Sequence, residues 1–288
     1  MLMLLPLGSD EREARAPRAT LALVALNLLV FLATQGFDLN KAEARETELE
    51  QIAAWTLRQG GQRVPALAAR LSTPALAFLE RDDLWREELA GTDLRERLES
   101  CLEDARQLRA AHPFHRWGFV PARITLGGLI THQFLHAGLL HLGFNMLFLW
   151  TVGGLLERTL GAALFLSVYL VGGVAAALAH AALNPASAEP AVGASGAVAS
   201  AMGAFAVLHA RERMRLALVA VPVLVPRVYF FSWPAWVFLG LWLLEQLFFA
   251  SFGSTTLGVA FGAHLGGFAF GALTGMTLRM LGLTAEAA

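Results

Sequence analysis

Charged side chains are scarce in this chain. They make up 16% of its 288 residues, against about 25% in soluble domains, while 56% of the residues are hydrophobic. The net charge of −1 offers no excess of basic residues for phosphates, so we expect no nucleic-acid partner. Cys101 is the single cysteine, which excludes an internal disulfide framework. The composition therefore predicts a membrane protein.

The N-terminus also lacks the pattern of a cleaved secretory signal. The apolar run in MLMLLPLGSDEREARAPRAT is short, and the charged residues follow it instead of preceding it. We therefore expect residues 1–19 to remain as a cytoplasmic segment.

Long apolar runs, in contrast, are frequent. A helix needs about 20 apolar residues to cross a bilayer, with a range of about 17–25. Six segments meet this length at least loosely: 20–36, 139–156, 160–183, 191–210, 233–250 and 257–281. The stretch 216–226 is apolar too, but it is short and interrupted by Pro222 and Pro226, so we interpret it as an interfacial loop. The sequence predicts an all-α protein with six transmembrane helices.

Basic residues in the short connections predict the orientation. The arginines that flank the six segments all fall on one side of the membrane, and they are Arg12, Arg15, Arg18, Arg158, Arg211, Arg213, Arg215 and Arg279. The connection NPASAEPAVG has no basic residue and is expected outside. We therefore expect a multi-pass protein of a bacterial cell membrane, with both termini cytoplasmic, a core over 114–282 and a cytoplasmic tail over 283–288.

Residues 37–113 differ in composition from the rest of the chain. They contain 11 Lys or Arg and 15 Asp or Glu, and their apolar residues recur at helical spacing. One helix is expected from Pro74, capped by Ser72 or Thr73, to Gly91, and another from Thr92 to just before Pro113. The segment is predicted to be a water-facing helical insert outside the membrane, and a simple solvated spacer is the alternative.

Four polar residues in three of the apolar segments are expected at similar depth near the outer surface. His141 and Asn145 lie four positions apart, on one face of a helix, while Ser195 and His264 come from two further segments. Polar side chains within spans are costly and are therefore indicative of function. The four residues predict that a reactive site lies in the outer layer of the bundle.

Acyl transfer is the chemistry that needs this set of side chains. The Ser195 hydroxyl is a weak nucleophile and needs a base, for which His264 is the candidate. His141 and Asn145 can donate hydrogen bonds to the oxyanion of the intermediate, together with the backbone N–H of Ser195. Gly193 and Gly196 leave room for a substrate backbone. No cofactor is implied.

Two other interpretations of these polar residues are weaker. Glu245 is the only acidic residue placed to complete a triad, and a Ser–His dyad explains the pattern better. His132, His136 and His141 lack the spacing of a metalloprotease helix and have no carboxylate nearby, so we expect no metal.

Three motifs, FLHAGLLHLGFNMLFLW, GASGA and AHLGGFAFG, together resemble the rhomboid family of intramembrane serine proteases. The resemblance covers roughly residues 117–281 and the first apolar segment. It implies that Ser195 is the nucleophile and His264 the base, that His141 and Asn145 form the oxyanion hole, and that transmembrane proteins are the substrates. It also implies that His136 orders the loop before the second span.

The resemblance assigns the small residues a packing role as well. Gly267 and Gly271 match glycines that let the sixth span press against the fourth, where Gly196, Ala199 and Gly203 form a stripe of small residues. Ala199 is a departure, because many rhomboids carry there an aromatic residue that stacks on the histidine. Phe261 or Phe268 is expected to hold the ring instead.

Two alternatives to a protease remain open. A rhomboid-like membrane protein can bind transmembrane helices without cutting them, although such relatives usually lack the serine or the histidine. A transporter would normally show internal repeats or broken helices in matching halves, and the sequence has neither.

Overall fold

The chain is organised in two units. The computed structural model describes residues 2–9, 16–34, 39–71, 74–220, 227–251 and 260–284. Unit 1 consists of Met1–Thr34 and Trp117–Ala288, and unit 2 consists of Gln35–Arg116. The segment expected as an insert, residues 37–113, lies within unit 2.

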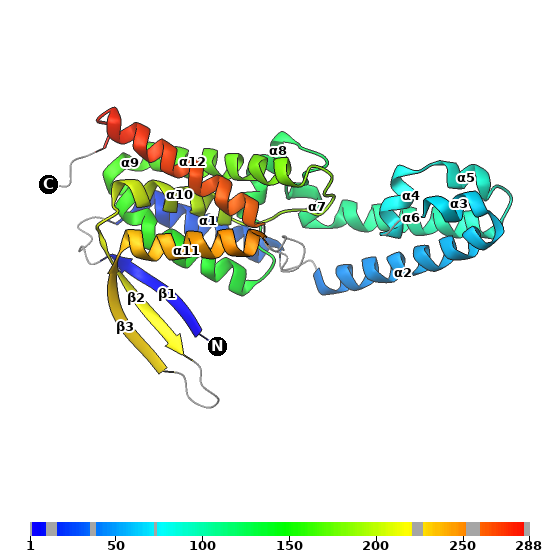
Figure 1. The fold of residues 1–288 in the computed structure, drawn as a ribbon, viewed down its shortest axis with the longest axis horizontal. Coiled ribbons are helices and arrows are strands. Elements are labelled where there is room, and N and C mark those ends of the chain that lie inside the picture. The colour runs from blue at the N-terminus through cyan, green and yellow to red at the C-terminus, as the bar shows by residue number, and fades with distance from the viewer. Residues whose placement is uncertain are drawn as a thin grey trace. The chain divides into compact units, whose positions relative to one another are not determined.

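Unit 1 is built mainly from helices (Figure 1). Its helices are α1 (Arg18–Thr34), α8 (Leu126–Thr131), α9 (Leu139–Leu183), α10 (Ser195–Leu208), α11 (Ala235–Ser251) and α12 (Phe261–Met280), with a 3-10 turn η1 (His132–Phe134). A short helix, α7 (Pro113–Trp117), lies at the sequence boundary between the units. Among the described residues, α9 is the one helix long and apolar enough to cross a membrane by length and composition.

A kink divides α9 into two segments. Gly161 has φ 75° and ψ 158°, a left-handed backbone conformation that favours glycine. The parts before and after it, 139–160 and 162–183, correspond to the second and third apolar segments of the sequence. A single glycine therefore separates two helices that would otherwise run on as one.

The helices α10 and α12 pack backbone to backbone. A Cβ atom at Gly267 would overlap the carbonyl oxygen of Gly196, and one at Gly271 would overlap that of Ser200. From the other side, a Cβ at Gly203 would overlap the carbonyl oxygen of Phe268. Close approach of this kind requires small residues at the interface. It places the start of α10 beside the first turns of α12.

A carboxylate holds the start of α1 against α9. The two oxygens of Glu157 accept hydrogen bonds from the backbone N–H groups of Ala19 and Thr20, each at 2.8 Å, and from the Thr20 hydroxyl at 2.9 Å. The first N–H groups of a helix have no partner within it, and a negative charge at that end is favourable. Glu157 therefore caps α1 from another helix.

Unit 1 also contains a three-stranded antiparallel sheet, so the chain is mostly helical, as expected, but the prediction that it is all-α is wrong in this part. Its strands are β1 (Leu2–Ser9), β2 (Arg213–Ala220) and β3 (Arg227–Pro234), in the order β1-β2-β3. The expected cytoplasmic segment thus contains a strand, and part of the expected interfacial loop is β2. The fifth apolar segment begins in β3, and α11 starts at Ala235. Pro222 and Pro226 lie outside the described residues.

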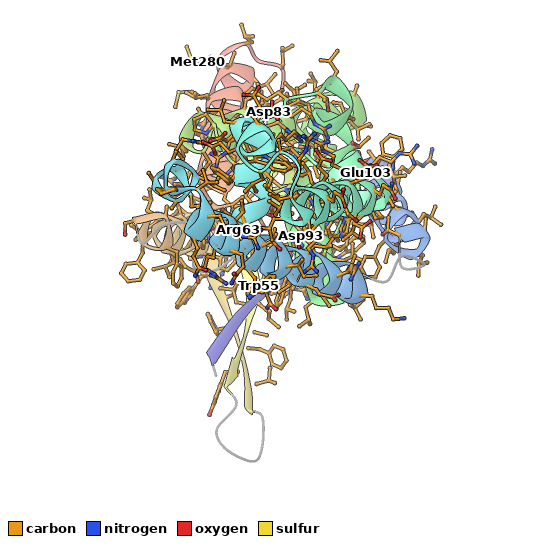
Figure 2. The ribbon with its side chains drawn as sticks, turned by 90° about the vertical axis from the view of Figure 1, so that its right-hand side faces the viewer. Trp55, Arg63, Asp83, Asp93, Glu103 and Met280 are labelled. Atoms are coloured by element: carbon orange, nitrogen blue, oxygen red, sulfur yellow. The ribbon has the colours of Figure 1, made fainter. Side chains whose placement is uncertain are left out.

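The sheet is fixed to the helices at one end and extends away from them at the other (Figures 1 and 2). Met214 and Leu216 of β2 are fully buried in the core that α9 and α10 share. Where β3 meets α11, the N–H of Ala235 donates to the carbonyl of Glu212 at 2.8 Å. The sheet is therefore part of unit 1 and not a separate body.

Unit 2 is a small helical unit with its own core. It contains α2 (Leu39–Arg63), α3 (Pro65–Arg70), α4 (Ala75–Arg81), α5 (Leu84–Glu88) and α6 (Asp93–Ala111). The helix α6 begins one residue after the predicted start at Thr92, and the Thr92 side chain caps it by accepting the N–H of Arg95 at 3.4 Å. The expected single helix from Pro74 to Gly91 is wrong, because α4 and α5 are separate helices. Ser72 and Thr73 lie outside the described residues.

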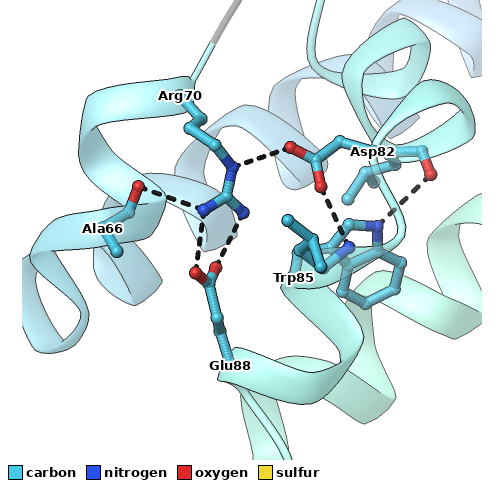
Figure 3. Close-up of polar contacts among 7 residues, drawn as sticks. Ala66, Arg70, Asp82, Trp85 and Glu88 are labelled. Carbon is cyan, nitrogen blue, oxygen red and sulfur yellow. Dashed lines mark hydrogen bonds and ion pairs between the residues drawn. The ribbon is translucent and has the colours of Figure 1, made fainter.

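Side chains at the centre of unit 2 form contacts around the junction between α4 and α5. Trp85 is fully buried, and its Nε1 donates to the carbonyl of Leu79 at 3.3 Å. Arg70 forms two hydrogen bonds to the carboxylate of Glu88, at 2.8 and 2.9 Å, and one to Asp82 at 2.9 Å (Figure 3). These bonds from the guanidinium lower the pKa of both carboxyl groups. Arg70 thereby joins α3 to the junction between α4 and α5.

Candidate active site

Ser195 is the first residue of α10, and its side chain is half-buried. The turn before it is held by the segment that precedes α9. The N–H of Gly193 donates to the carbonyl of His132 at 2.9 Å, and the N–H of Ala194 donates to Nε2 of His136 at 3.4 Å. Because a helix start leaves its N–H groups without intrahelical partners, the N–H of Ser195 is available for an anion.

Side-chain atoms of Ser195 and His141 both lie close to the position that a Cβ atom of Gly193 would occupy. Gly193 has φ +127°, and a Cβ atom there would lie 2.8 Å from Nε2 of His141 and 3.8 Å from Oγ of Ser195. Both polar atoms therefore lie within 4 Å of one point, which the missing side chain of Gly193 leaves open. The structure brings together the predicted nucleophile and one predicted oxyanion donor.

Asn145 lies one turn along α9 from His141 and is almost fully buried. Its amide nitrogen donates to the carbonyl of His141 at 2.8 Å. An amide group has two hydrogens, so the second can still be donated to a substrate oxygen. The same helix face thus carries both predicted oxyanion donors.

The three histidines considered as metal ligands have other contacts. Nδ1 of His132 lies 2.8 Å from the carbonyl oxygen of Gly128, and the rings of His136 and His141 meet edge to face at 5.2 Å between centroids. Within the described ranges, no three His, Cys, Asp or Glu side chains are grouped as metal ligands. His136 connects the loop before α9 to both His141 and the turn before Ser195.

His264 lies on α12, one residue after Ala263, whose Cβ lies 4.0 Å from the position that a Cβ atom of Gly196 would occupy. The side chain of His264 is half-buried. No hydrogen bond joins Ser195 to His264 in the part of the chain that the structure describes. The pairing of nucleophile and base therefore stays a prediction, and hydrogen bonds of this kind often tighten only when substrate binds.

The sequence interpretation missed Gln246. Its Oε1 lies 2.6 Å from Nδ1 of His264, and Gln246 is 6% exposed. Glu245, considered as the third member of a triad, is an exposed residue on the same helix. A signal was present in the sequence, because Gln246 is a second polar residue in an apolar segment and lies four positions after Trp242.

Aromatic rings complete the surroundings of His264. The ring of Trp242 lies 6.1 Å from that of His264 between centroids, and Phe261 meets it edge-on at 6.2 Å. Phe268 contacts Trp242 instead, at 5.9 Å. With Ala199 in place of an aromatic residue on α10, the ring of His264 has neighbours from α11 and α12.

Two curated proteins are similar to parts of this chain. One is the rhomboid protease GluP of Bacillus subtilis, 42% identical over 76 residues, which are 26% of this chain and 14% of that protein. The other is the mitochondrial rhomboid protein 1 of Saccharomyces cerevisiae, 34% identical over 109 residues, which are 36% of this chain and 30% of that protein. The chain thus matches less than a third of either relative's length.

The family comparison covers more of the chain than either relative. Residues 124–281 match the rhomboid domain, and these residues include α8 to α12 and every predicted catalytic and oxyanion side chain. The matched residues are more than half of the 288 in the chain. This match shows that the chain belongs to the rhomboid family.

Proposed function

We propose that this chain is an intramembrane serine endopeptidase that cuts transmembrane helices near their outer end. The observation that carries the proposal is the position of Ser195, whose Oγ shares the space over Gly193 with Nε2 of His141. Membership of the rhomboid family and the similarity to rhomboid protease GluP support it.

In the proposed reaction, Nε2 of His264 takes the proton of the Ser195 hydroxyl as Oγ attacks the scissile carbonyl carbon. The carbonyl oxygen becomes an oxyanion, which receives hydrogen bonds from His141, Asn145 and the N–H of Ser195. The C–N bond then breaks, and His264 gives its proton to the leaving amine. Water, deprotonated by His264, releases the acyl group and restores Ser195.

The membrane sets what the substrate must do before it is cut. A helix in lipid satisfies its own carbonyls with hydrogen bonds, which hides them from a nucleophile. The substrate must therefore unwind near the site, and we propose that this happens at the outer end of the bundle. The proposal includes six membrane spans, a bacterial cell membrane and cytoplasmic termini, in line with the distribution of arginines in the sequence.

Cleavage of a model transmembrane substrate by the purified protein tests the proposal. We expect Ser195→Ala and His264→Ala each to abolish cleavage without loss of the folded protein, because one removes the nucleophile and the other the base. Substantial turnover by purified Ser195→Ala would refute the assignment. A wild type that binds transmembrane helices but never cuts them would favour the inactive rhomboid-like alternative.

A further inference from the structure

One buried amide stands out in α11. The helix reads AWVFLGLWLLEQLFFAS, and the side chains next to Gln246 in the sequence are exposed: Leu244 by 63%, Leu247 by 49% and Phe248 by 58%. Gln246 is 6% exposed. An amide buried in apolar surroundings is costly unless it is hydrogen-bonded, so this orientation of Gln246 requires a partner. The partner is the ring of His264.

This hydrogen bond selects one tautomer of the neutral imidazole. An amide oxygen can only accept, so Nδ1 of His264 donates its hydrogen to Oε1 of Gln246, across 2.6 Å. A neutral imidazole carries one hydrogen, so Nε2 keeps its lone pair. A general base for Ser195 needs that lone pair. Trp242, one turn earlier on α11, lies beside the same ring.

We infer that Gln246 is a positioning residue, which holds His264 in the Nδ1–H tautomer and in the orientation that a base requires. The inference rests on the proposed function. It gives the site an orienting partner from α11, in a chain whose α10 carries Ala199 instead of an aromatic side chain. The partner is neutral, which avoids the cost of a carboxylate within the apolar layer.

Two substitutions at Gln246 separate hydrogen bonding from packing. Gln246→Met keeps much of the volume and removes the acceptor, whereas Gln246→Glu keeps the acceptor and adds a charge. The measurement is the rate at which a fluorophosphonate labels Ser195 in the full-length protein, recorded as a function of pH. Leu247→Met is the matched control, since it introduces the same side chain at an exposed position of the same helix.

We expect Gln246→Met to lower the labelling rate about 10- to 100-fold, by analogy with the loss of the hydrogen-bond partner of a metal-binding histidine. Gln246→Glu should retain labelling at high pH. The acid limb of its pH–rate profile, where labelling falls as the pH is lowered, should move to higher pH by roughly 1–3 units. A carboxylate beside the ring stabilises the imidazolium, which cannot act as a base. A residue that only filled space would leave that limb where it is.

The outcomes distinguish this inference from the proposed function. If wild type and Ser195→Ala are labelled alike, the proposed function fails and the role of Gln246 fails with it. If wild type is labelled at Ser195 and Gln246→Met matches Leu247→Met, the positioning role alone is wrong. Should Gln246→Met fail to fold, an unmoved acid limb in Gln246→Glu overturns the inference and a shifted one supports it.

Discussion

Two asparagines of unit 1 make the same hydrogen bond within their own helices. The amide of Asn27 donates to the carbonyl of Leu23, and that of Asn145 to the carbonyl of His141, each at 2.8 Å. Both side chains are buried, so each bond compensates for the removal of an amide from water. What differs is the position: Asn145 shares a helix face with His141, next to the turn that carries Ser195. The pair can therefore separate a structural role from the catalytic role that we propose for Asn145.

Asn145→Ala should lower kcat of substrate cleavage by about 10²–10³, the usual effect of losing one oxyanion donor. KM should change less, because the bond forms chiefly to the intermediate. His141→Ala should behave in the same way or lose more. The measurement is steady-state kinetics on a transmembrane substrate.

Asn27→Ala is the control for that prediction. It removes an equivalent amide-to-carbonyl bond from α1, outside the candidate site, and should reduce thermal stability while leaving kcat unchanged. If Asn145→Ala instead raised KM and left kcat intact, Asn145 would be a substrate contact and no oxyanion donor.

The polar residues of the candidate site could be predicted from the sequence, but the hydrogen-bond partner of His264 could not. Ser195, His141, Asn145 and His264 were found because polar side chains are rare in apolar segments. Gln246 was not predicted because the third group of a triad is normally acidic, and Gln246 is uncharged. An uncharged acceptor can orient a histidine equally well, and its i, i+4 spacing from Trp242 places both side chains on one face.

The contact between α10 and α12 dominates the packing of unit 1 at the scale of elements. Its glycines face backbone atoms of the opposing helix, which cannot move aside as a flexible side chain can. The hydrophobic effect does not favour contact between helices in a membrane, because lipid is as apolar as their side chains. Close van der Waals packing therefore contributes much of the free energy of their association. Loss of one such glycine should therefore disturb the position of His264 relative to Ser195.

Gly271→Ala should lower the free energy of unfolding of the purified protein by about 1–3 kcal/mol, the usual cost of overpacking, and lower its unfolding temperature accordingly. The added methyl group would meet the carbonyl of Ser200 in α10. Gly143→Ala in α9 is the control, since a Cβ there has open space, and it should be neutral or slightly stabilising. Equal unfolding temperatures for the two variants would contradict the tight contact.

The sheet was missed because its strands are apolar and lie next to helical segments. Apolar runs of this length do not distinguish a strand from a helix by period alone. Two local signals were nonetheless present. Arginines alternate with apolar residues from Arg213 to Leu216, and β3 is rich in aromatic and β-branched residues, which favour strands. Strand β1 had no comparable signal, since its pairing partner β2 lies more than 200 residues away.

At the scale of the whole molecule, the rhomboid match and unit 2 do not overlap. The match covers residues 124–281, whereas unit 2 consists of Gln35–Arg116 and has its own buried core around Trp85. None of the candidate site residues belongs to unit 2. The two units therefore should be separable in function.

Replacement of residues 35–116 by a flexible linker should leave a folded protein that still reacts with a fluorophosphonate at Ser195. Cleavage of a natural substrate should be measured separately, because loss of substrate recruitment would lower cleavage without changing the reactivity of Ser195. A linker variant that inserts and stays monodisperse in detergent but no longer reacts would show that unit 2 is needed for the active site.

We propose that Ser195 is a nucleophile activated by His264. The most direct test is to react the purified wild type with a fluorophosphonate and to locate the adduct by peptide mass spectrometry. We expect one adduct, on Ser195, that is lost in His264→Ala and absent from Ser195→Ala. A folded wild type with no adduct at Ser195, or labelling of Ser195 that persists without His264, would contradict it.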